Sequence, residues 1–177
     1  MGTRVNPEAV EVEAGRGNPC PPLPRRVPGY STGDLRTKAG RRHAAVFSCS
    51  PLAVTGARRW ARSVTGLPPS EAFGLELVVS ELASNAIKHS ASGHPGGFFT
   101  LRLAFLTCTR VRVAVTDGGP QVTDQTTFPD WNGACPDHDH GRGLVLVRKM
   151  SRHRCGVLGV AGAPLTVWAV IDRTDLR

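Results

Sequence analysis

The architecture of this chain is best approached from one segment, Ser80-Glu81-Leu82-Ala83-Ser84-Asn85-Ala86-Ile87-Lys88-His89. Glu81, Asn85 and His89 recur at every fourth position, so they share one face of a helix. A carboxylate and a carboxamide one turn apart present hard oxygen atoms, which Mg²⁺ prefers as ligands. Taken alone, the pattern fits a solvated polar face equally well.

The segment belongs to the second of two predicted helices. The second is expected to start at Ser70, a residue type that favours the N-cap position, and to run to about His89. Its expected buried side is Phe73, Leu77, Val78, Leu82 and Ile87. The first helix is expected to begin at Pro51 and to end before Gly66.

Strand-like alternation of apolar and polar residues surrounds these helices. The sequence predicts strands over 43–48, 99–105, 111–115, 154–160 and 164–171, and a third helix from Arg142 to Met150. Strands and helices are therefore grouped rather than strictly alternating. This grouping predicts an α+β two-layer sandwich, with a mixed, mostly antiparallel sheet and helices on one face.

The first forty residues differ from the rest. They are rich in proline and glycine and show no apolar periodicity, so they are predicted to form a disordered tail over 1–40. The folded domain is expected over 41–177. The five cysteines are scattered and form no CxxC pair, which is typical of reduced thiols. No signal peptide and no membrane span is expected, so the sequence predicts a cytoplasmic protein.

The formal net charge of +8 raises the question of nucleic acid as a partner. The basic residues are spread along the chain, and no basic run is interleaved with aromatic residues. The sequence therefore predicts no direct contact with nucleic acid.

Two glycine-containing clusters follow in the chain. Asp117-Gly118-Gly119-Pro120 comes directly after a predicted strand, where an aspartate can accept a hydrogen bond from an exocyclic amine. Gly141-Arg142-Gly143-Leu144 stands at a predicted helix start, where backbone N–H groups can hold phosphate. Taken alone, the first cluster is explained more simply as an ordinary turn, and the second as a flexible loop before a helix.

Together and in this order, the three clusters resemble the N box, G1 box and G2 box of the GHKL (histidine kinase-like) ATPase superfamily. Within it, the short chain, the Ser-Glu-Leu opening and the Gly-Arg-Gly-Leu box resemble the small anti-sigma-factor serine/threonine kinases. The resemblance implies the Bergerat ATP-binding fold, and ATP with Mg²⁺ as cofactors.

The resemblance also implies a role for each matched residue. Glu81 would be the catalytic base, and Asn85 would be the ligand to Mg²⁺. Asp117 and Gly119 would hold the adenine. Gly141 and Gly143 would belong to a mobile lid that closes over the phosphates. Lys88 and Arg142 would add positive charge near the phosphates.

The implied activity is phosphorylation of an anti-sigma-factor antagonist, combined with binding of a sigma factor, so that transcription is regulated by partner switching. Homodimerisation stays open. The alternatives are a non-catalytic module that binds ATP and partner proteins, and a protein kinase with no link to a sigma factor. The second glycine of the family's usual Asp-x-Gly-x-Gly motif is absent, because Pro120-Gln121 follows Gly119. Cys135, Asp137, His138 and His140 lie close together in the predicted lid, where zinc binding or a solvated surface would both be consistent with the sequence.

Overall fold

The computed structural model describes residues 32–37, 40–120, 128–131 and 142–172. It contains one antiparallel sheet and three α-helices. In chain order, the elements are β1 (Thr32–Thr37), β2 (Gly40–Ser48), α1 (Ala53–Thr65), the 3₁₀ turn η1 (Pro69–Glu71), α2 (Phe73–His89), the 3₁₀ turn η2 (Ala91–Gly93), β3 (Phe98–Phe105), β4 (Arg110–Thr116), α3 (Arg142–Met150), β5 (Cys155–Leu158) and β6 (Thr166–Asp172).

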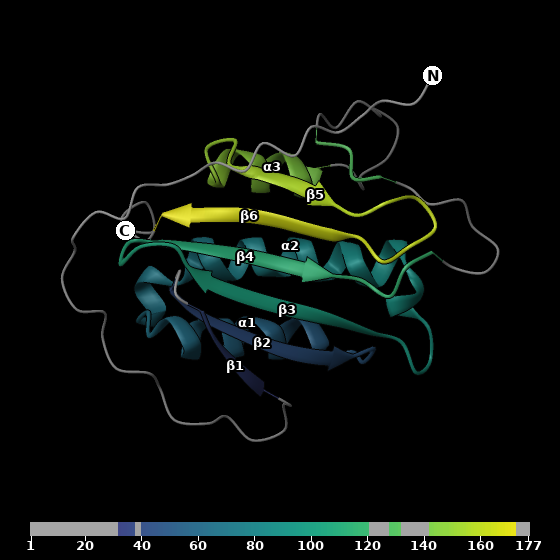
Figure 1. Ribbon diagram of the computed structural model, residues 1–177, viewed down its shortest axis with the longest axis horizontal. Coiled ribbons are helices and arrows are strands. Elements are labelled where there is room, and N and C mark those ends of the chain that lie inside the picture. Colours follow the sequence, from purple (N-terminus) through teal and green to yellow (C-terminus); the bar gives the residue numbers. More distant parts are fainter. Residues whose placement is uncertain (1–31, 38–39, 121–127, 132–141, 173–177) are drawn as a thin grey trace.

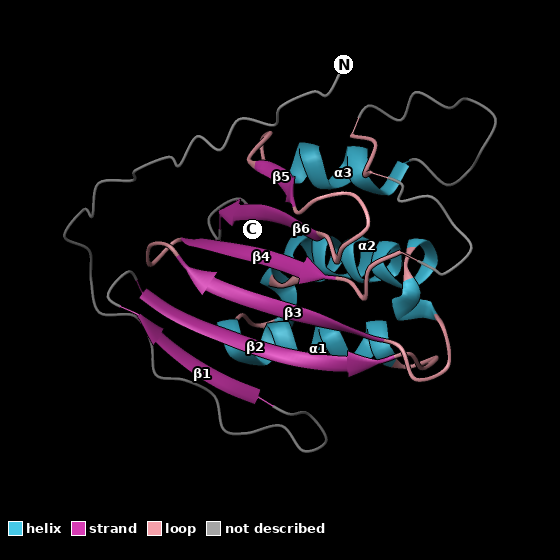
Figure 2. Ribbon diagram, turned by 45° about the vertical axis from the view of Figure 1, so that its right-hand side comes forward, coloured by secondary structure: helices cyan, strands magenta, loops and turns pink. Residues whose placement is uncertain are grey.

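The six strands lie in the order β1-β2-β3-β4-β6-β5. Every pairing within the described residues is antiparallel. Figures 1 and 2 show the helices gathered on one side of this sheet, with α1 and α2 lying side by side and α3 beyond β6. The predicted α+β two-layer sandwich with helices on one face is confirmed.

The core forms where alternate residues of the central strands face α1 and α2. Val111, Val113 and Val115 of β4 are almost completely buried. They face the helices because successive side chains of a strand point to opposite faces of the sheet. Across the sheet, Phe99 of β3 stacks on Phe47 of β2 with 5.4 Å between ring centroids. The alternation that the sequence displays therefore sets which face of each strand is covered.

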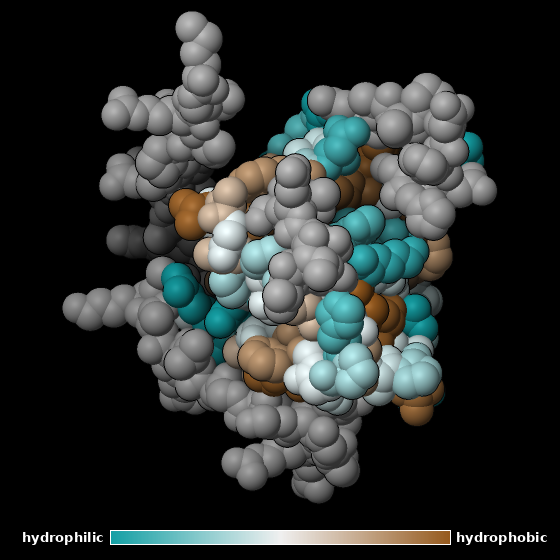
Figure 3. Space-filling view, turned by 90° about the vertical axis from the view of Figure 1, so that its right-hand side faces the viewer, coloured by the Kyte–Doolittle hydropathy of each residue, from teal (hydrophilic) through white to brown (hydrophobic). Residues whose placement is uncertain are grey.

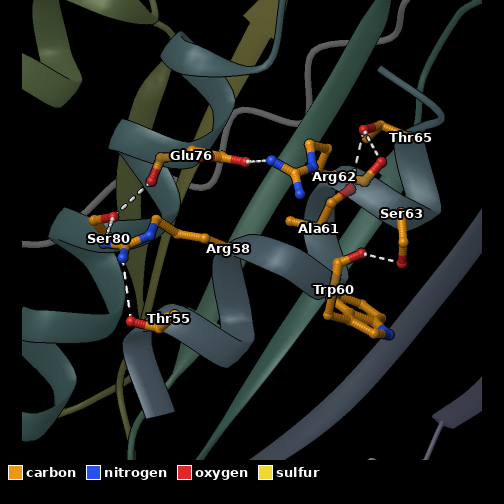
Figure 4. Close-up of polar contacts among 9 residues, drawn as sticks. All are labelled: Thr55, Arg58, Trp60, Ala61, Arg62, Ser63, Thr65, Glu76 and Ser80. Carbon is orange, nitrogen blue, oxygen red and sulfur yellow. Dashed lines mark hydrogen bonds and ion pairs between the residues drawn. The ribbon is translucent and has the colours of Figure 1, made fainter. Parts of the chain in front are cut away.

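Polar contacts fasten α1 to α2 outside this core (Figure 4). Arg58 Nη1 donates to Ser80 Oγ at 3.2 Å, and Ser80 Oγ donates in turn to the Glu76 carbonyl at 2.7 Å. One turn further along, Arg62 Nη1 lies 3.0 Å from Glu76 Oε1. These pairs run in opposite directions along the two helices, so α1 and α2 are antiparallel. The residue before Glu81 is thereby fixed to the neighbouring helix.

Strand β1 corrects the predicted domain boundary. The sequence predicts a disordered tail through residue 40, but Thr32–Thr37 pairs with β2 along its whole length. Strand pairing uses backbone N–H and C=O groups, which a search for apolar periodicity does not detect. Residues 1–31 lie outside the described part of the chain.

The start of α2 also differs from prediction. Ser70 lies in η1, and α2 begins at Phe73 after the cap residue Ala72, whose side chain makes no capping hydrogen bond. Phe73 is 71% exposed, so it does not belong to the buried face. The proline at position 69 favours a separate short turn before the helix because it fixes its own φ angle. No helix in the described residues combines the length and apolarity needed to cross a bilayer.

The neighbours Phe98 and Phe99 provide a direct test of the strand register. Phe99 is fully buried and Phe98 is 53% exposed, on opposite faces of β3. We expect Phe99→Ala to lower the free energy of unfolding by about 3–5 kcal/mol. The matched control Phe98→Ala should change it by less than about 0.5–1 kcal/mol. Urea denaturation of both variants would reveal a register error if the larger loss came from Phe98→Ala.

Candidate nucleotide site

A cavity of about 250 Å³ lies between α2, α3 and the ends of β4 and β6. This end of the molecule faces the viewer in Figure 3, where hydrophobic and hydrophilic residues lie side by side on the surface. Apolar walls combined with a few polar groups are typical of small-molecule sites. The lining consists of Leu82, Asn85, Ala86, His89, Val115, Asp117, Phe128, Pro129, Asp130, Leu144, Leu165 and Val167.

Helix α2 places two of its polar residues on this cavity. Asn85 and His89, one turn apart, both line it, with Leu82 and Ala86 beside them. Within the described part of the chain, the Asn85 side chain makes no hydrogen bond. Its carbonyl oxygen therefore remains available to a ligand.

Glu81 lies one turn before Asn85 and faces the start of α3. A Cβ atom added at Gly143, the second residue of α3, would overlap the Glu81 carboxylate oxygen Oε2. The carboxylate thus approaches a helix N-terminus, where unpaired N–H groups carry partial positive charge. The first turn of α3 contains no acidic residue of its own. Glycine at 143 is what leaves room for Glu81 there.

Asp117 is held at the end of β4 by backbone groups. Its Oδ1 accepts hydrogen bonds from the N–H of Gly119 at 2.8 Å and from the N–H of Leu165 at 2.9 Å. The Asp117 N–H donates to the Leu165 carbonyl at 3.0 Å. These bonds fix the carboxylate beside the cavity and leave Oδ2 without a hydrogen-bond partner among the described residues.

The turn after Asp117 is fixed by η2. Ser92 is fully buried, and its hydroxyl accepts from the Gly118 N–H and donates to the Phe98 carbonyl, both at 2.8 Å. The Ala91 N–H donates to the Gly119 carbonyl at 2.9 Å. The segment that follows α2 therefore positions the segment that follows β4. No sequence pattern singled out Ser92, because a serine in a polar loop is unremarkable until the fold buries it.

The remaining predicted site residues are placed less directly. Gly119 adopts a φ of +84° and is buried beside Pro164, so the turn itself requires glycine there, and its contact with adenine stays a prediction. Lys88 and Arg142 are both exposed and lie next to the site rather than on its wall. Gly141 lies outside the described residues, as does the cluster of Cys135, Asp137, His138 and His140. Among the residues that are described, no group of three or more His, Cys, Asp and Glu side chains could hold a metal ion.

Several wall residues were not predicted as part of a site. Leu144, Leu165 and Val167 were expected only as apolar residues of a helix and a strand, and they form much of the apolar surface of the cavity. His89 was expected only to share a helix face with Glu81 and Asn85, and it also lines the cavity. An aromatic base needs such apolar walls, but any core position would show the same sequence signal.

A family model described as a histidine kinase-like ATPase domain matches residues 47–156, more than half of the chain. The chain belongs to the histidine kinase-like ATPase domain family. The comparison with curated proteins gave no match to this chain.

The residues present fit the ligands that these ATPase domains bind, which are ATP and usually Mg²⁺. The apolar walls can hold adenine, and Asp117 Oδ2 can accept a hydrogen bond from its amino group. Asn85 can give one oxygen to Mg²⁺, which typically takes one or two protein ligands and completes its shell with phosphate and water. The start of α3 offers backbone N–H groups of the kind that bind phosphate.

Asp117→Asn separates ligand binding from stability. The amide oxygen can still accept the N–H groups of Gly119 and Leu165, so we expect only a small loss of unfolding free energy. An NH₂ group would replace Oδ2 and could not accept from adenine, so ATP affinity should fall about tenfold or more. Titration calorimetry and urea denaturation measure the two effects. Asp117→Ala is the control that should lose both, and equal losses in Asp117→Asn would show that the aspartate serves only the turn.

Proposed function

We propose that this protein is an ATP- and Mg²⁺-dependent serine/threonine kinase of the anti-sigma-factor type. The observation that carries the proposal is the position of the Glu81 carboxylate against Gly143 at the start of α3. A module that only bound nucleotide would gain nothing from a carboxylate at the place where phosphate oxygens are expected, because like charges repel there.

The geometry suits a base for phosphoryl transfer. Glu81 precedes Asn85 by one helical turn, so a carboxylate lies beside the predicted ligand of Mg²⁺. A hydroxyl group that reached the Glu81 carboxylate beside the start of α3 would meet both a proton acceptor and a region of positive potential. Positioning and electrostatic stabilisation account for most of the catalysis in transfers of this kind.

In the proposed step, the γ-phosphoryl group of ATP moves to a hydroxyl group of the partner protein. The oxygen of a partner's serine or threonine hydroxyl forms a bond to the γ-phosphorus of ATP, and its proton passes to the Glu81 carboxylate. The bond between the γ-phosphorus and the oxygen that bridges it to the β-phosphorus breaks, and ADP leaves with that bonding electron pair. Asn85 would give one oxygen ligand to Mg²⁺, and the ion would supply positive charge beside the phosphate oxygens.

The identity of the partners rests on the motif resemblance. The proposed phosphate acceptor is an anti-sigma-factor antagonist, and the proposed second partner is a sigma factor. Exchange between the two would regulate transcription in the cytoplasm. The shared sequence words are Ser80-Glu81-Leu82 and Gly141-Arg142-Gly143-Leu144. The competing proposal is a non-catalytic module that binds ATP and changes its protein partners.

Glu81→Gln distinguishes the two proposals. The amide has nearly the same shape as the carboxylate, so ATP affinity should change less than about threefold. It cannot take up a proton near neutral pH, so transfer of labelled phosphate to a purified serine-bearing antagonist should fall about a hundredfold or more. The paired measurement is ATP affinity by calorimetry and phosphate transfer under single-turnover conditions.

Asn85→Ala is the matched control on the same face of α2, and it should weaken Mg²⁺-dependent ATP binding itself. Full transfer by Glu81→Gln would eliminate Glu81 as the base. Absence of transfer by the wild type with every candidate antagonist, despite normal ATP binding, would support the non-catalytic module.

A further inference from the structure

The sheet face turned away from the helices, called here the open face, is strongly basic. Within β2 to β6, this face carries four arginines, Arg42, Arg102, Arg110 and Arg112, and a single carboxylate, Asp172. Arg110 already pairs with that carboxylate at 3.5 Å. The open face lies across the sheet from the nucleotide cavity, so its charge cannot serve the phosphates of ATP.

Three of these arginines surround small side chains. In the sheet register, Ala104 of β3 lies between Arg42 of β2 and Arg112 of β4. On the next row, Arg102 of β3 lies beside Ala114 of β4. Arg42 and Arg102 are exposed, whereas Arg112 is half-buried. Arg102 Nη1 donates to Thr116 Oγ1 at 2.7 Å, and the alanines between the arginines are small. Arg42, Arg102 and Arg112 are called here the arginine patch.

The positive charge of the arginine patch is incompletely compensated. Within the described part of the chain, Arg42 makes no hydrogen bond or ion pair, and the Nε of Arg112 is buried with no acceptor. Burial, followed by the nearby charge of Arg42, lowers the pKa of Arg112 from its usual value. An anionic group between the two arginines would relieve both effects.

The surroundings of Trp168 argue that the anionic group between the arginines does not belong to a molecule with a nucleobase. The guanidinium carbon of Arg112 lies 4.4 Å from the centre of the Trp168 ring. Gly156 supports the ring from β5, since a Cβ atom added there would lie 3.0 Å from its Cζ2. Arg112 occupies one face of the ring and Gly156 lies against its Cζ2 and Nε1 atoms, so a base could not stack on the face that Arg112 covers.

Exposed apolar side chains lie on the same face as the arginine patch. They are Val46 (45%), Phe98 (53%) and Leu158 (52%). Arginine and aromatic residues combined with exposed aliphatic side chains are typical of protein interfaces. A second copy of this chain would bring two arginine clusters together with few carboxylates to oppose them, which is unfavourable.

We propose that the open face binds an acidic, partly apolar segment of another protein. The carboxylates of that segment lie between Arg42, Arg102 and Arg112, and its apolar residues cover the exposed apolar side chains of the same face. The proposal does not depend on phosphate transfer, because the surface and the nucleotide cavity lie on opposite faces of the sheet. It assigns partner binding to a face that the motifs of the nucleotide site do not touch.

The test uses a fluorescent peptide of about twelve alternating glutamate and valine residues, which at roughly 3.3 Å per residue can cross the sheet. We expect the full-length protein to bind it, and the double variant Arg42→Gln/Arg102→Gln to bind about three- to tenfold more weakly in fluorescence anisotropy. The control is Arg59→Gln/Lys149→Gln, which removes the same charge from exposed positions on α1 and α3 and should bind normally. A glutamine–valine peptide should bind weakly to all three proteins.

Charge reversal makes the test independent of folding defects. Arg42→Glu/Arg102→Glu should lose the glutamate peptide and gain a lysine–valine peptide, with an unchanged thermal midpoint. Equal weakening by the control variant would refute a localised surface. Tighter binding of a single-stranded oligonucleotide that also depends on Arg42 and Arg102 would replace the proposal with a nucleic-acid surface. A dimer in sedimentation that dissociates in the Arg42/Arg102 variant would replace it with self-association.

Discussion

Two backbone N–H groups donate hydrogen bonds to one carboxylate oxygen, and these bonds hold together the end of the molecule that contains the cavity. Asp117 Oδ1 joins the turn after β4, through Gly119, to the start of β6, through Leu165. Ser92 then ties the adjacent Gly118 to the segment that follows α2. The two halves of the cavity, one from α2 and one from the strands, are therefore aligned by a residue that also lines the cavity. The same carboxylate serves the fold with one oxygen and is free to serve recognition with the other.

The parts of the fold that sequence predicts well are those governed by periodicity. The central strands β3 and β4 alternate strictly, and the helices between residues 53 and 89 have apolar faces that the sheet covers. Periodicity carries no information on β1, because an edge strand is stabilised by backbone pairing. It also misplaces Phe73, since an apolar residue in the first turn of a helix can point past the end of the core.

The site divides along similar lines. Asn85 and Asp117 could be predicted because the chemistry of their side chains and their place at the end of a helix or strand are both visible in the sequence. The contact of Glu81 with Gly143 could not, because it depends on where α3 lies relative to α2 across some sixty residues of intervening chain. The apolar walls at Leu144 and Leu165 carry no distinguishing signal. Tertiary packing alone separates a cavity wall from any other core residue.

Helix α3 covers the cavity with few buried residues. Of its nine residues, Leu144 and Val147 are the ones fully buried, whereas α2 buries seven. Two such side chains stabilise the docked helix by only about 3–6 kcal/mol. Elements anchored this weakly open locally far more often than the whole domain unfolds. Local opening of α3 would therefore uncover one wall of the cavity while the sheet wall stays in place, so the residence time of a nucleotide bound there would depend on how often α3 opens.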